Sequence, residues 1–347
     1  MSNAPSNSLA IADRTRLTRV VLAQATSTAQ WRADLLDLGA PSCGDPPEEA
    51  YLDECAKIAK QHVAPETWAL IEAMHTPDGP HAVVLQSPLD PHVPDPPQNS
   101  KRPESKTYVT EGALWGCAQA SDSEVVAFDP VLYGSTSVHE VAPAGAHATQ
   151  PTGASRQILT HHNDHADKKP EFQPDVLWLT ALLNDGSVPT RVTSASEVLA
   201  SVPTWAIETA TRPLFRQIVA EADVGVQMKA PPRPILDWTE SGPHLFISPN
   251  GVESLEEQAE AALSCILASA SRAKGVDVLL QPTSDVETSI LCLNNKRSLH
   301  GRGTIASNDR RWLQRLYSMR SVEALRSVTG TSCGRIFDLR RGVLIPY

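Results

Sequence analysis

Three residues in two separate segments carry side chains that commonly bind metal ions. His162 and Asp164 stand two positions apart in "THHNDHAD", and His300 lies in "SLHGRG". Residues i and i+2 of an extended strand point to the same face, so the spacing predicts that His162 and Asp164 lie side by side. Two histidines and one carboxylate with open coordination positions form the facial triad of non-haem Fe(II) sites. We therefore predict that these three residues bind Fe(II).

A cluster of arginines surrounds and follows His300 in a chain whose net charge is −10. The cluster consists of Arg297, Arg302, Arg310, Arg311 and Arg315. A guanidinium group pairs with a carboxylate as a bidentate fork, which suits the distal carboxylate of 2-oxoglutarate. The distance along the chain from His300 allows a strand, a turn and a returning strand, which would bring Arg311 or Arg315 beside the iron. We expect this cluster to bind a dicarboxylate.

The elements that must position these residues are strands. From about residue 124, short apolar runs such as "EVVAF", "DVLWLTALL", "SILCLNN" and "RWLQRLYSM" alternate with Pro, Gly and Asp. Helical spacing is found over 46–74 and near 107–120, and again over 194–210 and 252–273. This pattern predicts a mainly β fold with α elements, a double-stranded β-helix (jelly roll) with a helical outer layer.

We expect one domain over 13–347, preceded by a disordered tail over 1–12. The domain is predicted to have an N-terminal helical part over 13–120 and a jelly-roll core over 121–330, with an insertion at about 194–273. Within the insertion, a stretch over 211–251 has few periodic signals and contains Pro231, Pro232 and Pro234. Long irregular insertions are commonly lids, so we expect this stretch to close over the iron once substrate binds.

Composition excludes several classes of partner. The acidic balance argues against nucleic-acid binding, which requires a basic surface. No apolar run reaches the length of a membrane span, so no membrane partner is expected. Six cysteines are scattered without C-x-x-C spacing, which is typical of reduced thiols in a cytoplasmic protein.

The segments "LCLNNKRSLHGRG" and "DRRWLQRLY" resemble the distal motif of a known family. This family is the clavaminate synthase-like branch of the Fe(II)/2-oxoglutarate oxygenases, within the taurine dioxygenase superfamily. The segments "STSVHEVAPAGAHATQPTGASRQILTHHND" and "DVLWLTALLNDGSVPTRVTS" also resemble that branch. The resemblance covers roughly residues 120–320.

The resemblance implies a role for each matching residue. Fe(II) would be bound by His162, Asp164 and His300, and the distal carboxylate of 2-oxoglutarate by Arg311 with help from Thr190. Arg315 would grip the carboxylate of an amino-acid substrate or support the cosubstrate. The activity implied is the use of O2 and 2-oxoglutarate to hydroxylate, desaturate or cyclise an amino acid or an amino-acid derivative at an unactivated C–H bond, as part of biosynthesis.

One departure from the family concerns the substrate side chain. Arginine hydroxylases of this branch carry an acidic pair in a stretch that "GPHLFISPNGVESLEEQ" resembles, and here Ser248 and Asn250 stand in its place. These two residues are expected to face the substrate. A cationic side chain would lose its partners there, and a buried unpaired charge is costly. A preference for free arginine is therefore in doubt, and a neutral or differently charged derivative fits as well.

Three alternatives stay open at this point. A shift by one residue would place His161 and Asn163 at the iron and leave no carboxylate, as in halogenating relatives. A jelly-roll protein that binds metal or 2-oxoglutarate without turnover is the second. The third is a zinc hydrolase using the histidines near 161–165, although the chain has no H-E-x-x-H helix and this reading leaves the arginines unexplained.

Overall fold

The computed structural model describes residues 17–128, 136–143, 155–219, 228–330 and 335–337. The predicted tail over 1–12 lies outside the described residues. Within them, no helix has the length and apolar character needed to cross a membrane.

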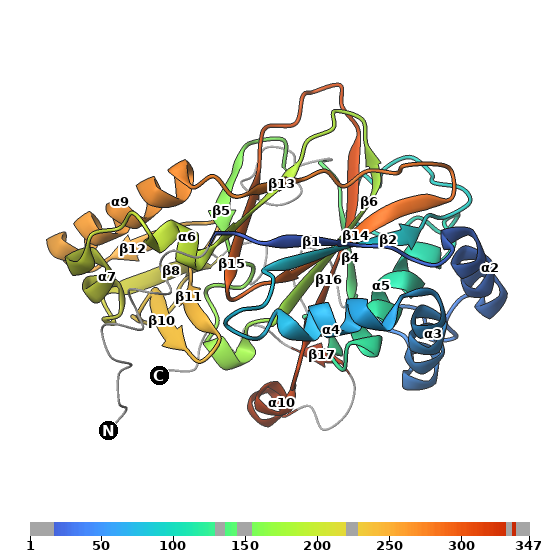
Figure 1. Ribbon diagram of the computed structural model, residues 1–347, viewed down its shortest axis with the longest axis horizontal. Helices are drawn as coiled ribbons and strands as arrows, with labels where there is room; N and C mark the ends of the chain where they lie inside the picture. Colours follow the sequence, from blue (N-terminus) through green and yellow to red (C-terminus); the bar gives the residue numbers. More distant parts are fainter. Residues whose placement is uncertain (1–16, 129–135, 144–154, 220–227, 331–334, 338–347) are drawn as a thin grey trace.

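A large sheet forms the centre of the molecule (Figure 1). Its strands run in the order β1 (Val20–Ala23), β2 (Ala82–Pro88), β14 (Glu287–Asn294), β6 (Val176–Asn184), β16 (Arg311–Met319), β3 (Glu124–Phe128) and β17 (Ile336–Phe337), with β4 (Val138–Val141) also paired to β16. Only the β1–β2 and β17–β3 pairs are parallel among the strand pairs of the described residues. The N-terminal part over 13–120, predicted as helical, thus contributes the strands β1 and β2 as well.

A second sheet of four strands faces the first. Its order is β13 (Val276–Val278), β7 (Thr190–Ser194), β15 (Ser298–Arg302) and β5 (Leu159–His162). One apolar cluster joins the facing sides of the two sheets, with Leu179 and Leu313 from the large sheet and Val192 and Val278 from the small one. This arrangement confirms the predicted double-stranded β-helix.

Helices cover the other face of the large sheet. They are α2 (Thr28–Leu38), α3 (Glu49–His62), α4 (Pro65–Ala73) and α5 (Val109–Ala120), and they share an apolar cluster with that face. The helices predicted over 46–74 and 107–120 are therefore confirmed. Because both faces of the sheet are covered, the central strand β6 is buried along almost its whole length, and its sequence "VLWLTALLN" is apolar nearly throughout.

The insertion packs against the outer face of the small sheet, where Leu299 of β15 joins its apolar cluster. It contains α6 (Ala195–Leu199), α7 (Thr204–Ala210), β8 (Phe215–Val219), β9 (Met228–Lys229), β10 (Leu236–Thr239), β11 (Gly242–Leu245), β12 (Val252–Ser254) and α9 (Glu257–Arg272). The described part of 211–251 is thus made of short strands, in contrast to the irregular stretch expected. Strands of two to five residues are too short to show a clear alternation.

Two short helices complete the described elements. They are η2 (Pro170–Phe172), which follows the turn after β5, and α10 (Glu323–Thr329), which follows β16. Leu325 of α10 and Phe172 of η2 both belong to the apolar cluster between the sheets. These helices therefore close one end of the space in which that cluster lies.

Candidate metal centre

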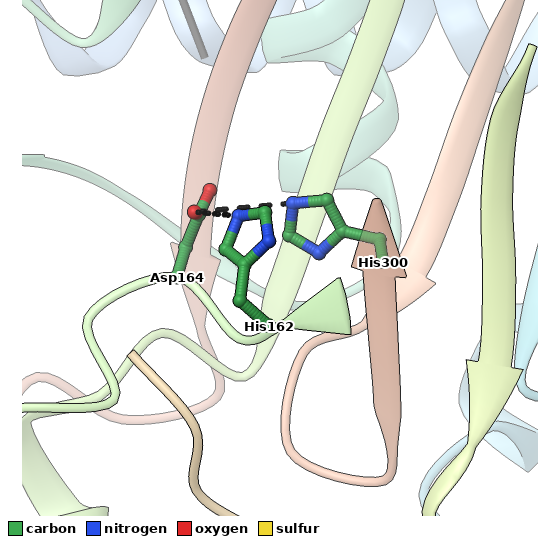
Figure 2. Close-up of side chains that lie close together, drawn as sticks. All are labelled: His162, Asp164 and His300. Atoms are coloured by element: carbon green, nitrogen blue, oxygen red, sulfur yellow. Dashed lines mark ion pairs between the residues drawn. The ribbon is translucent and has the colours of Figure 1, made fainter. Parts of the chain in front are cut away.

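His162, Asp164 and His300 meet between the two sheets. Each offers one ligand atom, and the three atoms lie within 4.8 Å of one another in a buried position. Figure 2 shows both imidazole rings turned toward the carboxylate of Asp164. Nε2 of His162 lies 3.4 Å from Oδ1 of Asp164, and Nε2 of His300 lies 3.9 Å from the same oxygen. This is the donor set of the non-haem Fe(II) facial triad.

The two histidines meet because β5 and β15 pair in a specific register. His300 stands directly opposite His162 in the antiparallel pair, so both side chains point to the same face. Gly301 makes the close approach possible, because a Cβ atom built on it would lie 2.7 Å from the carbonyl oxygen of Leu159. The glycine of the "HGR" motif therefore allows the two strands to pair.

Replacing Gly301 with alanine should push β15 away from β5 and separate the two histidines. We expect Fe(II) binding to weaken by about 10–100-fold, the usual cost of losing support around a metal ligand. Anaerobic calorimetric titration with Fe(II) measures this. Gly303→Ala is the matched control, because a Cβ atom there meets nothing within 4 Å. Equal affinities of the two variants would contradict the role given to Gly301.

Asp164 lies outside the strand, which corrects one step of the sequence argument. Strand β5 ends at His162, and Asp164 begins the turn that follows it. The side chain of Asn295 holds this turn in place: its Oδ1 accepts from the backbone N–H of Asp164, and its Nδ2 donates to the Asp164 carbonyl. Gln173 donates to the same carbonyl. The shared orientation of His162 and Asp164 therefore comes from a braced turn and not from strand alternation.

The charge states of Asp164 and His300 suit a divalent cation. Burial raises the pKa of the Asp164 carboxyl, but the charge of Arg315 and the neighbouring histidines outweigh burial and hold this pKa well below its usual range. Burial, together with His162, lowers the pKa of His300 to about 3, so its imidazole is neutral at ordinary pH. Nδ1 of His162 donates a hydrogen bond to the carbonyl oxygen of Thr160, 2.8 Å away. Nε2 is therefore the ring nitrogen that is available as a ligand atom. A neutral imidazole and an ionised carboxylate are the forms that bind Fe(II), and His300 and Asp164 are in these forms.

The structure does not support the register shifted by one residue. Nε2 of His161 lies 3.1 Å from the hydroxyl of Thr193. The side chain of Asn163 donates to the carbonyls of Asn295 and Ser298, and its Oδ1 accepts from the backbone N–H of Ile247. Both side chains are therefore engaged away from the triad.

Arg311 is a buried cation on the inner face of β16. Its side chain is only 3% exposed, and burial, followed by the charge of Arg302, lowers its pKa to about 9. Among the described residues, its Nε atom has no hydrogen-bond partner and no carboxylate forms an ion pair with it. A buried charge without a partner strongly destabilises the folded protein. An anionic ligand bound to Arg311 would therefore stabilise it.

Thr190 and Arg302 lie opposite each other in the β7–β15 pair, two positions from Val192 and His300. Because alternate residues share a face, the Thr190 hydroxyl is on the same side of the small sheet as His300. The guanidinium of Arg302 donates to the carbonyls of Gln157, Ser155 and Gly303. Arg302 therefore braces the chain leading into β5, and the predicted contact of Thr190 with the cosubstrate carboxylate stays a prediction.

Arg315 lies against the triad itself. Its Nη1 is 3.3 Å from Oδ2 of Asp164, and its Nη2 is 3.2 Å from Nδ1 of His139. Arg311, Leu313, Arg315 and Tyr317 alternate along β16 and share its inner face. The division of roles between Arg311 and Arg315 stays a prediction, but Arg315 is the one that touches the metal-ligand set.

The side chains of Ser248 and Asn250 belong to a turn of the insertion. The Ser248 hydroxyl donates to the carbonyl of Ile218, 2.9 Å away, and accepts from the backbone N–H of Asn250. The Ser248 backbone N–H donates to Gln217. Ser248 can donate to a substrate only by giving up its bond to Ile218, so its predicted contact with substrate stays untested.

Sequence reasoning missed two residues that contact the triad region. Tyr317 donates a hydrogen bond to Asp164, and Asn295 holds the Asp164 backbone. Tyr317 was within reach of the sequence argument, because it follows Arg315 by two positions in the same predicted strand. No short-range signal marks Asn295, since it acts across 131 positions of the chain.

Several solved structures with the same fold are oxygenases that bind iron. Asparagine oxygenase in complex with Fe(II), 3-hydroxyasparagine and succinate has a TM-score of 0.78 and 21% identity over 92% of this chain and 99% of its own. OrfP with Fe and alpha-ketoglutaric acid (2-oxoglutarate) has a TM-score of 0.72 and 20% identity over 91% of this chain and 99% of its own. OrfP with Fe, succinate and (3R,4R)-dihydroxy-L-Arg has a TM-score of 0.73 and 19% identity over 92% of this chain and 100% of its own. No protein-family model and no curated protein matches the sequence.

Proposed function

We propose that this protein is an Fe(II)- and 2-oxoglutarate-dependent oxygenase of the clavaminate synthase-like type, which hydroxylates an amino acid or an amino-acid derivative. The observation that carries the proposal is the buried set of His162, Asp164 and His300 between the two sheets of a double-stranded β-helix. The fold shared with asparagine oxygenase and OrfP supports it. A zinc hydrolase would leave the buried cation Arg311 without a purpose.

The three residues of the centre share one task, and the apolar side chains around them have another. His162, Asp164 and His300 would hold Fe(II), which when bound supplies the activation of O2 needed to oxidise an unreactive C–H bond. Three ligands from the protein would leave coordination positions for the cosubstrate and O2. The apolar side chains between the sheets exclude water from this space.

2-Oxoglutarate suits the buried cation Arg311, which lies on the same strand face as Arg315. Arg311 would form a bidentate pair with the distal carboxylate, with the Thr190 hydroxyl as a further donor. Binding this carboxylate would give the buried guanidinium the counter-charge that it lacks among the described residues. The keto-acid end of the molecule would then point toward the iron ligands.

We propose a neutral side chain for the substrate. Asparagine oxygenase is solved with 3-hydroxyasparagine, and OrfP with hydroxylated arginines, so related folds bind amino acids with neutral and with cationic side chains. The charge of Arg315 suits the carboxylate of an amino acid. Ser248 and Asn250 stand where the arginine hydroxylases of this branch carry an acidic pair, so a cationic side chain would lack the partners that it has in those enzymes.

The proposal is tested by substrate-stimulated turnover. Protein loaded with Fe(II) under anaerobic conditions is mixed with 2-oxoglutarate, O2 and single amino acids or their derivatives, and succinate release is measured together with the mass of the product. The expected result is succinate formation coupled to the addition of one oxygen atom to a neutral amino acid. Binding of iron and 2-oxoglutarate without succinate release on any substrate would favour the non-catalytic alternative.

A further inference from the structure

The two carboxylate oxygens of Asp164 have different surroundings. Oδ1 faces Nε2 of His162 and Nε2 of His300, at 3.4 and 3.9 Å. Oδ2 accepts a hydrogen bond of 2.7 Å from the hydroxyl of Tyr317 and lies 3.3 Å from Nη1 of Arg315. Oδ1 is thus turned toward the two histidines, while Oδ2 is bound by Tyr317 and Arg315.

The position of the Tyr317 hydroxyl is set by the core. Tyr317 lies on β16 and is 1% exposed. Its ring packs against Phe128, His139 and His165, with ring centroids 5.8, 5.7 and 5.0 Å away. Because three rings pack against it, the tyrosine ring holds its hydroxyl at a fixed position. The orientation of the Asp164 carboxylate is therefore set by the position of this hydroxyl.

Arg315 competes with the metal for the same carboxylate. A guanidinium group prefers to pair with both oxygens of a carboxylate at once. Asp164 belongs to a turn, so no strand geometry fixes its side chain. If the carboxylate rotated to pair with Arg315 through both oxygens, Oδ1 would leave His162 and His300. The hydroxyl of Tyr317 opposes this rotation because it anchors Oδ2.

We propose that Tyr317 is a positioning residue of the metal centre: its hydroxyl anchors Oδ2 of Asp164, so that Oδ1 stays turned toward the two histidines and away from Arg315. The inference rests on the proposed function, because it concerns the binding of Fe(II) by the triad. It also assigns a purpose to a tyrosine that the iron, cosubstrate and substrate roles leave unused.

The test is the affinity for Fe(II), measured by anaerobic titration without any turnover. Tyr317→Phe removes only the hydroxyl, and we expect Fe(II) to bind about 10–100-fold more weakly. Tyr51→Phe is the matched control. It also removes a tyrosine hydroxyl that donates a hydrogen bond, in this case to the carbonyl of Gly39 at the C-terminal end of α2. We expect both variants to lose a similar amount of thermal stability, and only Tyr317→Phe to lose affinity for Fe(II).

A double-mutant cycle tests the competition with Arg315. In an Arg315→Gln background no guanidinium remains to capture Asp164, so the further change Tyr317→Phe should alter the Fe(II) affinity by less than about twofold. Two results would overturn the inference: Tyr317→Phe binding Fe(II) as tightly as the parent protein, or its full loss of affinity persisting in the Arg315→Gln background. If the parent protein itself fails to bind Fe(II), the proposed function fails, which is a separate outcome.

Discussion

Replacing His162 with alanine should abolish the release of succinate from 2-oxoglutarate. The change removes one of three ligands from a set whose atoms lie within 4.8 Å of one another. The effect should exceed the 10–100-fold loss that is typical when a partner outside the metal's own ligands is removed. Fe(II) affinity, measured by anaerobic titration, should fall together with turnover.

The neighbouring histidine is the control for this experiment. His161→Ala makes the same chemical change one position earlier, but His161 faces the hydroxyl of Thr193 and not the triad. We expect its Fe(II) affinity and turnover to stay close to those of the parent protein. If His161→Ala lost iron and His162→Ala kept it, the register of the metal centre would be the shifted one.

Replacing Arg311 with alanine should raise the concentration of 2-oxoglutarate needed for half-maximal turnover by about a hundredfold to ten-thousandfold. A hydrogen bond to a charged group contributes about 1.5–3 kcal/mol, and a bidentate pair makes two of them. Fe(II) binding should change little, because Arg311 contacts none of the three metal ligands in the described structure. Steady-state kinetics at varied 2-oxoglutarate and an anaerobic Fe(II) titration measure the two effects.

Two further variants sharpen the Arg311 experiment. Arg311→Lys should recover only part of the affinity for 2-oxoglutarate, because an ammonium group lacks the planar fork. Arg310→Ala is the matched control: Arg310 is the preceding residue, it is exposed, and it pairs with Asp185. The roles of the two arginines would be reversed if Arg311→Ala kept its affinity for the cosubstrate and Arg315→Ala lost it.

Much of the jelly roll was readable from the sequence because its strands are buried on one or both faces. Runs such as "DVLWLTALL" and "RWLQRLYSM" are long enough to show their apolar character, and they form β6 and β16. The strands β9 and β12 in the insertion have two and three residues, and no periodicity can be seen over so few positions. The pairing of β1 with β2 is likewise a tertiary contact that cannot be predicted from the short sequence "VVLA".

The candidate site, too, was predictable from the sequence only in part. The identities of His162, Asp164 and His300 were predicted correctly as a group that comes together, but the reason given for the first two was wrong. A strand would have aligned them by alternation, whereas the structure aligns them through a turn held by Asn295 and Gln173. Such bracing depends on hydrogen bonds between distant segments, and the spacing of residues within one segment carries no information about it.

Asn163 lies between two of the predicted ligands, and its hydrogen-bond partners are all made later than Asn163 itself during synthesis of the chain. Its side chain binds the carbonyls of Asn295 and Ser298, and it exchanges hydrogen bonds with Ile247 through its own backbone N–H and its side-chain oxygen. These partners lie 84 to 135 positions further along the chain, so the ribosome must deliver the insertion and strand β15 before the pocket of ligands exists. An unfinished chain can offer iron only isolated side chains, which bind weakly and reversibly. Iron bound by these three residues would therefore have to enter after the insertion and β15 have folded around them.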